Sequence, residues 1–274
     1  MNIYYLKDEL NPSLDCPGIT YPFYEVTPEQ LEKASPKECL VIAAKDETIR
    51  LANRLKLPVM GYVNPKIPGQ SYVGVEMLVE GFEEVEDLFI LRVFQRHHNL
   101  PWTICETKRC VVRELTLSDL PALFELYEAP GVTDYTEGLY AYEEEYEYQK
   151  AYIHHMYGYY GYGMWLVYHK ETGRLIGRAG LEHREIEGEV HLEMGYVIHP
   201  MYQRQGYATE VCEKIVEYAW RNTSFSKICC LIEPRNVASI ALIEKLGGKL
   251  AENPRIILKN QEYLVYNILS ISGK

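Results

Sequence analysis

A turn between a predicted strand and a predicted helix has the residue types and spacing of a phosphate-binding segment. Gln203, Gly206 and Ala208 form the pattern Q-x-x-G-x-A. Small residues let a backbone approach a diphosphate closely, and the first N–H groups of a helix are unpaired donors in a favourable dipole. The pattern predicts that main-chain N–H groups here bind a pyrophosphate, although an ordinary glycine-containing turn fits the same residues. The predicted segment comprises Gln203, Arg204, Gln205, Gly206, Tyr207, Ala208 and Thr209.

A second pattern lies further along the chain, after another predicted helix and strand. Asn236, Ser239, Leu242, Lys245 and Gly247 follow the spacing N-x-x-S-x-x-L-x-x-K-x-G, and the glycine marks the end of a helix. Taken singly, an asparagine that caps a helix and a serine on its surface have ordinary structural explanations. The two patterns in this order are not expected by chance, which favours one shared ligand site.

Together the two patterns resemble those of the GNAT acetyltransferases, over residues 107–274 and closest to the RimJ/RimL branch. Arg113 in the first strand, the strand of Glu193 to Tyr196, and the EKLGG end of the second helix add to the likeness. Ala208 stands where the strongest form of the first pattern has a second glycine. The resemblance implies acetyl-CoA as the co-substrate and a primary amine, in a small molecule or at a protein N-terminus, as the acceptor.

The resemblance also implies roles for individual residues along the co-substrate. Val197 and Ile198 would hydrogen-bond the pantetheine arm through their backbone, and residues 203–209 would hold the pyrophosphate. Asn236 would reach the pantetheine or its phosphates. Ser239 would lie beside the thiol.

Acetyl transfer to an amine requires that the amine lose a proton. A lysine-like amine with a pKa of about 10.4 is protonated at neutral pH, and an α-amine with a pKa of about 8 much less so. We expect Glu193 to be the general base, with Glu182 as the second candidate. For each, a solvated or ion-paired carboxylate is the alternative. Ser239 or a tyrosine would protonate the leaving thiolate, and direct attack needs no covalent intermediate.

Tyrosines and carboxylates are dense in the segment before the second predicted strand of this half. Aromatic faces beside Glu143 to Glu147 could cradle a cationic amine, or the tyrosines could simply pack against the sheet. The tract from Gly158 to Gly163 is expected to be a mobile loop. The tyrosines are Tyr140, Tyr142, Tyr146, Tyr148, Tyr152, Tyr157, Tyr159, Tyr160, Tyr162 and Tyr168.

The elements that must position these residues can be read from the apolar periodicity. We expect helices over 118–128, capped by Ser118, over 143–157, from the 203–209 turn to Trp220, and over 234–248. The predicted strands are 107–113, 164–168, 175–182, 189–198 and 227–233. This order gives an α+β fold with a mixed, largely antiparallel central sheet flanked by helices.

The first part of the chain predicts a smaller, Rossmann-like α/β domain. Compact apolar strands at 39–44, 57–62 and 77–79 alternate with helices at 46–55 and 85–97, as in a parallel sheet. We place the boundary so that residues 1–104 form this domain and residues 107–274 the GNAT domain.

Residues 38–95 resemble the C-terminal part of a haloacid-dehalogenase (HAD) type domain. In that family acidic residues end a strand and hold magnesium, but Ala43 and Ala44 stand at the corresponding positions. Asp8 and Asp15 are in unrelated contexts, so no D-x-D nucleophile motif precedes them. We expect this domain to be non-catalytic, a scaffold or a partner-binding module.

Composition excludes several classes of partner. A net charge of -11 argues against a nonspecific nucleic-acid surface. No apolar run approaches the ~20 residues of a membrane helix, and no secretory signal is apparent, so we expect a cytoplasmic protein without a membrane partner. The seven cysteines lack metal-like spacing, and no metal is expected. A homodimer and a catalytically silent acetyl-CoA sensor stay open alternatives.

Overall fold

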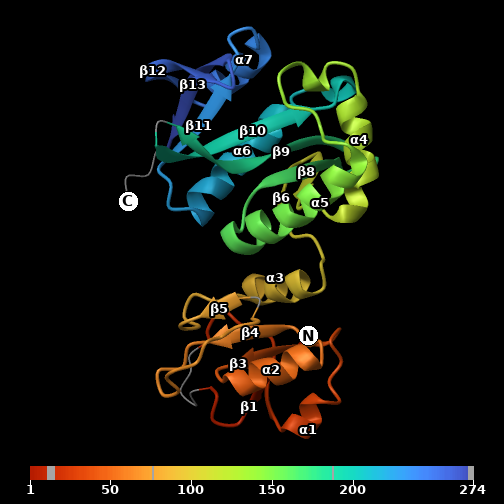
Figure 1. Cartoon of the computed structure of the whole chain (residues 1–274), viewed down its shortest axis with the longest axis vertical. Coiled ribbons are helices and arrows are strands. Elements are labelled where there is room, and N and C mark those ends of the chain that lie inside the picture. Colours follow the sequence, from red (N-terminus) through yellow and green to blue (C-terminus); the bar gives the residue numbers. More distant parts are fainter. Residues whose placement is uncertain (11–15, 76, 187, 271–274) are drawn as a thin grey trace. The chain divides into compact units, whose positions relative to one another are not determined.

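The computed structural model describes residues 1–10, 16–75, 77–186 and 188–270 (Figure 1). The chain divides into two compact units, Met1–Trp102 and Thr103–Lys274, and each is described by itself below. Asp15, which bears on the missing D-x-D motif, lies outside the described residues.

The N-terminal unit is built on a parallel five-stranded sheet with the order β2-β1-β3-β4-β5. Alternate residues of β3 enter two cores, because side chains on a strand point to opposite faces. Leu40 and Ile42 pack with Ile90 of α3, and Val41 packs with Ile49 of α2. The elements are β1 (Asn2–Leu6), β2 (Phe23–Val26), α1 (Pro28–Leu31), β3 (Cys39–Ala43), α2 (Asp46–Arg54), β4 (Val59–Tyr62), β5 (Met77–Val79) and α3 (Asp87–His97).

This arrangement confirms a Rossmann-like α/β sheet in the first part of the chain. The strand order is that of doubly wound sheets of the 2-1-3-4-5 type. The likeness to HAD-type domains stays a prediction. The first two strands and α1 were not predicted, because their short segments carry little apolar periodicity.

The C-terminal unit is built on an eight-stranded sheet with the order β12-β13-β11-β10-β9-β8-β7-β6. Neighbouring strands are antiparallel except β10 and β11, which confirms the expected mixed, largely antiparallel sheet. Its strands are β6 (Thr103–Glu106), β7 (Cys110–Arg113), β8 (Met164–His169), β9 (Leu175–Ile186), β10 (Glu189–Ile198), β11 (Lys227–Ile232), β12 (Lys249–Leu258) and β13 (Gln261–Leu269).

Helices cover both faces of this sheet (Figure 1). Trp165 of β8 packs against Tyr218 of α6 on one face, and Arg178 of β9 lies near Tyr152 of α5 on the other. The helices are η1 (Leu117–Asp119), α4 (Leu120–Glu128), η2 (Val132–Asp134), α5 (Tyr142–Tyr152), η3 (Ile153–Tyr160), η4 (Pro200–Tyr202), α6 (Tyr207–Asn222) and α7 (Val237–Lys245).

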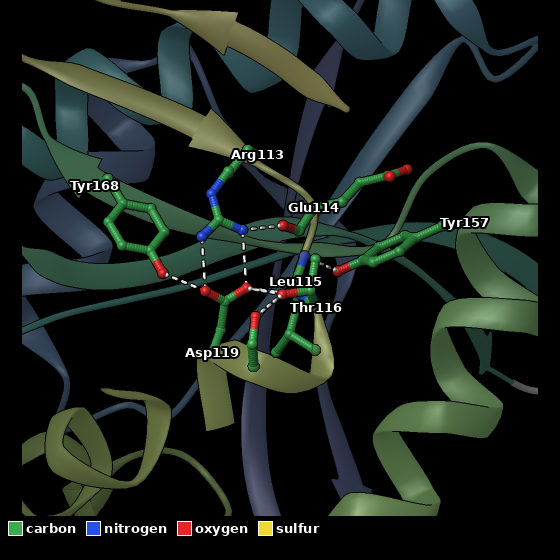
Figure 2. Close-up of polar contacts among 8 residues, drawn as sticks. Arg113, Glu114, Leu115, Thr116, Asp119, Tyr157 and Tyr168 are labelled. Atoms are coloured by element: carbon green, nitrogen blue, oxygen red, sulfur yellow. Dashed lines mark hydrogen bonds and ion pairs between the residues drawn. The ribbon is translucent and has the colours of Figure 1, made fainter. Parts of the chain in front are cut away.

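The sequence predicted that Ser118 caps the first helix of this unit, and this prediction is wrong. Thr116 caps the short helix η1 instead, in a capping box with Asp119 (Figure 2). Asp119 also accepts two hydrogen bonds from the Arg113 guanidinium, at 2.7 and 2.8 Å, and one from the Tyr168 hydroxyl at 2.8 Å. Burial alone would raise the pKa of Asp119, but these partners lower it below its ordinary value. The cluster fixes the end of β7 to the start of α4.

Part of the tract from Gly158 to Gly163 is helical rather than the predicted loop. Its first residues belong to the π-helix η3, in which Tyr157 is fully buried. The Tyr157 hydroxyl donates to the carbonyl of Met164 at 2.5 Å. It accepts from the amide of Leu115 at 3.3 Å (Figure 2). Packed tyrosines, which the sequence pattern does not distinguish from exposed ones, hold the segment in place.

Candidate active site

The two parallel strands of the large sheet separate partway along their length. β10 pairs with β9 from Glu189 to Ile198, but among the described residues it pairs with β11 only at Leu192 and Glu193. The edge of β10 beyond Glu193 therefore leaves the ladder, and backbone groups there lack strand partners on that side. Val197 and Ile198, predicted to bind pantetheine, both lie in this opened segment.

The predicted phosphate turn lies directly after the opened segment. Arg204 and Gly206 have left-handed backbone conformations, with φ of 57° and 84°. Gly206 caps α6 without a side-chain hydrogen bond, and the Glu210 amide makes the helix's first backbone bond, to Gly206, at 3.0 Å. The N–H groups of Tyr207, Ala208 and Thr209 come before that bond, so they belong to the set that a helix start leaves unpaired.

The Gln203 side chain folds back from the turn and bonds the end of β10. Its side-chain amide donates to the carbonyl of Ile198 at 2.8 Å. Gln205 similarly donates to the carbonyl of Met201 at 2.7 Å. Both side chains therefore shape the turn, and main-chain N–H groups are left to face an anion.

Arg109, which directly precedes β7, holds the phosphate turn, and the sequence analysis did not single it out. Its Nε donates to Glu210 at 2.8 Å and its Nη1 to the carbonyl of Gln205 at 3.1 Å. The guanidinium also lies 3.9 Å from the ring centre of Tyr207. The pKa of Glu210 is lowered, because hydrogen bonds from Thr107 and Arg109 and the Arg109 charge outweigh its burial. The first turn of α6 is thus anchored by an ion pair.

The two carboxylates predicted as bases are brought together. Glu193 of β10 and Glu182 of β9 are direct cross-strand partners, so their side chains share one face of the sheet. Glu193 accepts from the Nε of Arg184 at 2.5 Å, and Glu182 accepts from the Tyr152 hydroxyl at 2.7 Å. The Tyr152 hydroxyl in turn accepts from the Met164 amide at 2.8 Å.

Glu193 is largely buried beside a second carboxylate and an arginine. Its side chain is 13% exposed. Burial raises its pKa above the ordinary glutamate value, and the Glu182 charge adds to the rise, while Arg184 opposes it. A carboxylate with a raised pKa accepts a proton more readily than an exposed one, which suits general-base chemistry.

Asn236 and Ser239 lie at the start of α7. The Asn236 side-chain oxygen accepts from the Ser239 amide at 3.2 Å and caps the helix, which is the structural alternative considered for this residue. The Tyr196 hydroxyl donates to the Ser239 carbonyl at 3.3 Å and ties α7 to β10. The ligand-binding roles of both residues stay predictions.

The tyrosines of the acceptor segment fall into two groups. Tyr152, Tyr157 and Tyr162 are buried and pack against the sheet. Exposed rings lie along α5 and just before it, and the side chain of Tyr159 lies outside the described residues. The exposed group is Tyr140, Tyr142, Tyr146 and Tyr148.

The described ranges contain no group of three or more His, Cys, Asp or Glu side chains that could hold a metal ion. No helix within them combines the length and apolarity that a membrane crossing requires.

Comparisons with known proteins identify the family. The model of the acetyltransferase (GNAT) domain matches residues 109–249, more than half of the chain. The uncharacterized N-acetyltransferase YnaD of Bacillus subtilis is 29% identical over 142 residues, which are 52% of this chain and 79% of YnaD. The uncharacterized protein YkkB of the same organism is 34% identical over 88 residues, 32% of this chain. That match spans about half the length of YkkB (51%).

A solved structure adds evidence on the fold. RimL, a ribosomal L7/L12 alpha-N-protein acetyltransferase in complex with coenzyme A, superposes with a TM-score of 0.52 at 16% identity. The superposition covers 61% of this chain and 98% of RimL. The likeness concerns the fold, and the family match carries the assignment: the chain belongs to the GNAT acetyltransferase family.

Proposed function

We propose that the C-terminal unit transfers an acetyl group from acetyl-CoA to a primary amine, of a small molecule or a protein N-terminus, by direct attack in a ternary complex. The observation that carries the proposal is the separation of β10 from β11 beyond Glu193. The opened edge runs from the Gly206 turn to this buried carboxylate. An extended ligand with a diphosphate at the turn would therefore reach Glu193 with its far end, as a coenzyme A thioester does.

The co-substrate supplies an activated acyl group, and the residues of the chain bind it. Main-chain N–H groups of residues 203–209 would face the pyrophosphate, and the backbone of Val197 and Ile198, along the edge of β10 that leaves β11, would face the pantetheine. The RimL complex with coenzyme A, on the same fold, supports this assignment. Asn236 and Ser239 flank the opening from α7.

Glu193 takes the proton from the attacking amine. The new N–C bond forms as the C–S bond breaks, and the leaving thiolate takes up a proton from Ser239, a tyrosine or water. Arg184 holds the Glu193 carboxylate at 2.5 Å, so the base is oriented before the acceptor arrives. Unpaired N–H groups of β10 would stabilise the oxyanion.

A second candidate function is an acetyl-CoA-binding sensor without turnover. The ion pair of Glu193 with Arg184 favours it, because a fully engaged carboxylate can also be structural. In this alternative the opened strands and the Gly206 turn bind the co-substrate, and Glu193 only stabilises the sheet.

We also propose that residues 1–104 form a non-catalytic scaffold or partner-binding domain and residues 107–274 the transferase domain. Support comes from the carboxyl edge of the parallel sheet, where the Glu9 carboxylate accepts from the amides of Ala44 and Lys45 at 2.6 and 3.1 Å. The chain's own carboxylate thus occupies the position at the start of α2 where a phosphate ligand would bind.

Acceptor-dependent release of free CoA thiol tests the transferase against the sensor. We expect turnover with one class of amine or peptide acceptor in a broad panel, and loss of about a hundredfold or more in kcat for Glu193→Gln with the affinity for acetyl-CoA kept. Thiol release that never depends on an acceptor would favour the sensor. Normal turnover by Glu193→Gln would show that another group is the base.

A further inference from the structure

Arg178 is a buried arginine that has no carboxylate partner. It lies in the middle of β9, between Val197 of β10 and Leu166 of β8, and it is 8% exposed. Its Nε has no hydrogen-bond partner among the described residues. An arginine stays protonated in a protein, and a buried charge without a counter-charge is costly. The chain therefore keeps a positive charge inside the fold without an ion-paired carboxylate among the described residues.

Neighbouring arginines of the same unit are paired, which makes Arg178 distinct. Arg184, further along β9, pairs with Glu193, and Arg113 pairs with Asp119. Two carboxylates act on the tyrosines around Arg178. Glu182 accepts a hydrogen bond from Tyr152, and the pKa of Tyr157 is raised first by burial and also by the charge of Glu114. Within the described residues, no ion pair joins Glu182 to Arg178.

Tyrosines surround the Arg178 guanidinium. The ring centre of Tyr152 lies 5.8 Å from it, and Tyr127 and Tyr157 are its other close neighbours. Burial lowers the pKa of Arg178, but the three hydroxyls more than compensate and keep it raised. Hydroxyls and ring faces leave the formal charge without a counter-charge, so this cluster of tyrosines is suited to an added anion.

Arg178 and the proposed base lie on one face of the sheet. Glu182 lies four positions after Arg178 on β9, so both side chains project from the same face of the sheet. Glu193, the cross-strand partner of Glu182, shares that face. Tyr152 connects the two groups, because its hydroxyl donates to Glu182 while its ring lies beside Arg178. A carboxylate pair and an unpaired guanidinium thus lie at opposite ends of one tyrosine.

We propose that the acceptor carries a carboxylate in addition to its amine, and that Arg178 binds this carboxylate while Glu193 deprotonates the amine. An amino acid or the acidic N-terminal residue of a peptide provides both groups. The inference rests on the proposed acetyl transfer and names its substrate class. Arg178 is then a specificity residue, because it selects acceptors by their negative charge.

The test compares matched acceptors with wild type and Arg178→Met. One arm uses each amino acid against its decarboxylated amine, such as lysine against cadaverine, and the other uses peptides that begin with Asp or Asn. We expect wild type to prefer the carboxylate-bearing member of the pair, and Arg178→Met to lose that preference through a rise of about tenfold or more in acceptor KM. The KM for acetyl-CoA should not change. Arg174→Met, in the exposed turn before β9, is the control.

Protein stability separates this role from a structural one. A methionine replaces an unpaired buried charge, so we expect the Tm of Arg178→Met to match or exceed that of wild type. Calorimetric titration of the CoA-bound protein with the same amino acids gives a readout without turnover, and binding should be lost in the variant. Equal use or binding of both members of every pair would overturn the inference, as would a change confined to acetyl-CoA. Thiol release with no amine at all would overturn the transferase proposal instead.

Discussion

The starts of α2 and α6 show how the two units treat an anion site differently. At α2 the chain fills the site itself, because Glu9 is 1% exposed and accepts from the amides of Ala44 and Lys45 and from the Thr48 hydroxyl. At α6 the cap is Gly206, which has no side chain. The acidic residue of that first turn, Glu210, is turned toward Arg109.

The difference teaches that a strand, a turn and a helix do not by themselves make a ligand site. Both helix starts offer N–H donors and a favourable dipole. The start of α2 already has its negative charge, whereas that of α6 is kept clear by a glycine and by an ion pair that withdraws the nearest carboxylate. We therefore expect substitutions at the two places to have opposite consequences for ligand binding.

The largest effect is expected for Gly206→Val, which tests the open site. Gly206 has a φ of 84°, where a β-branched residue is strained, and the new side chain would approach Arg109. Affinity for acetyl-CoA should fall by roughly a hundredfold, measured by calorimetry. Gly173→Val, in the turn between β8 and β9, has a φ of 65° and open space around the new Cβ, so it introduces the same strain as a control and should keep the affinity. Equal affinity of both variants for acetyl-CoA would show that the Gly206 turn does not bind the phosphates.

The next effect concerns the filled site. Glu9→Ala leaves two buried amides and a hydroxyl without their acceptor, so the free energy of unfolding should fall by about 2 to 3 kcal/mol. Added inorganic phosphate should restore part of the loss, because the vacated helix start can then bind it. Denaturant unfolding measures both effects. Glu47→Ala, exposed in the same first turn of α2, is the control, and the absence of phosphate rescue would contradict the comparison.

A smaller effect is expected at the ion pair that clears the α6 site. Arg109→Met releases Glu210, whose carboxylate can then face the phosphates of the co-substrate. We expect the KM for acetyl-CoA to rise by roughly five- to tenfold, with kcat nearly unchanged. The double variant with Glu210→Gln should recover part of the affinity. Steady-state kinetics at two ionic strengths would show whether the loss is electrostatic.

Local patterns were enough to predict most of the fold and the phosphate turn. The strands around Glu193 and the Gly206 turn depend on neighbours in sequence, and so do the alternating strands and helices of the first unit. The hairpin of β12 and β13 was not predicted, and neither was the short first strand pair. The helix expected to end at Tyr157 continues to Tyr160, and its last residues were mistaken for a loop, because glycines and tyrosines carry no periodic signal of burial.

The features of the site that the sequence could not predict are contacts between residues far apart in the chain. The hydrogen bond from Arg109 to Glu210 joins residues 101 positions apart, and that from Ala44 to Glu9 joins residues 35 apart. Such partners are decided by sheet order, which no local spacing encodes. Asn236 was predicted as a ligand-binding residue from a motif, and the same side chain also satisfies a helix end, which a motif does not distinguish.

The smallest effect is expected for Arg184. It sharpens the comparison because Arg184 pairs with the proposed base Glu193 as Arg109 pairs with Glu210. Burial raises the pKa of Glu193 and Arg184 opposes that rise. Because the base must be ionised, kcat/KM should fall on the acid side of its pH profile, and the midpoint of this acid limb should lie above the ordinary glutamate pKa. Arg184→Met should move this limb upward by roughly one pH unit.

The direction of that shift separates two roles of the ion pair. If Arg184 only stabilised the sheet, its loss would lower the Tm and leave the acid limb where it is. If Arg184 tunes Glu193, activity should fall at low pH and recover at high pH, because the uncompensated carboxylate holds its proton to a higher pH. Arg255→Met removes an exposed pair with Glu262 and should do neither. A limb that moves downward would mean that a group other than Glu193 sets the pH dependence.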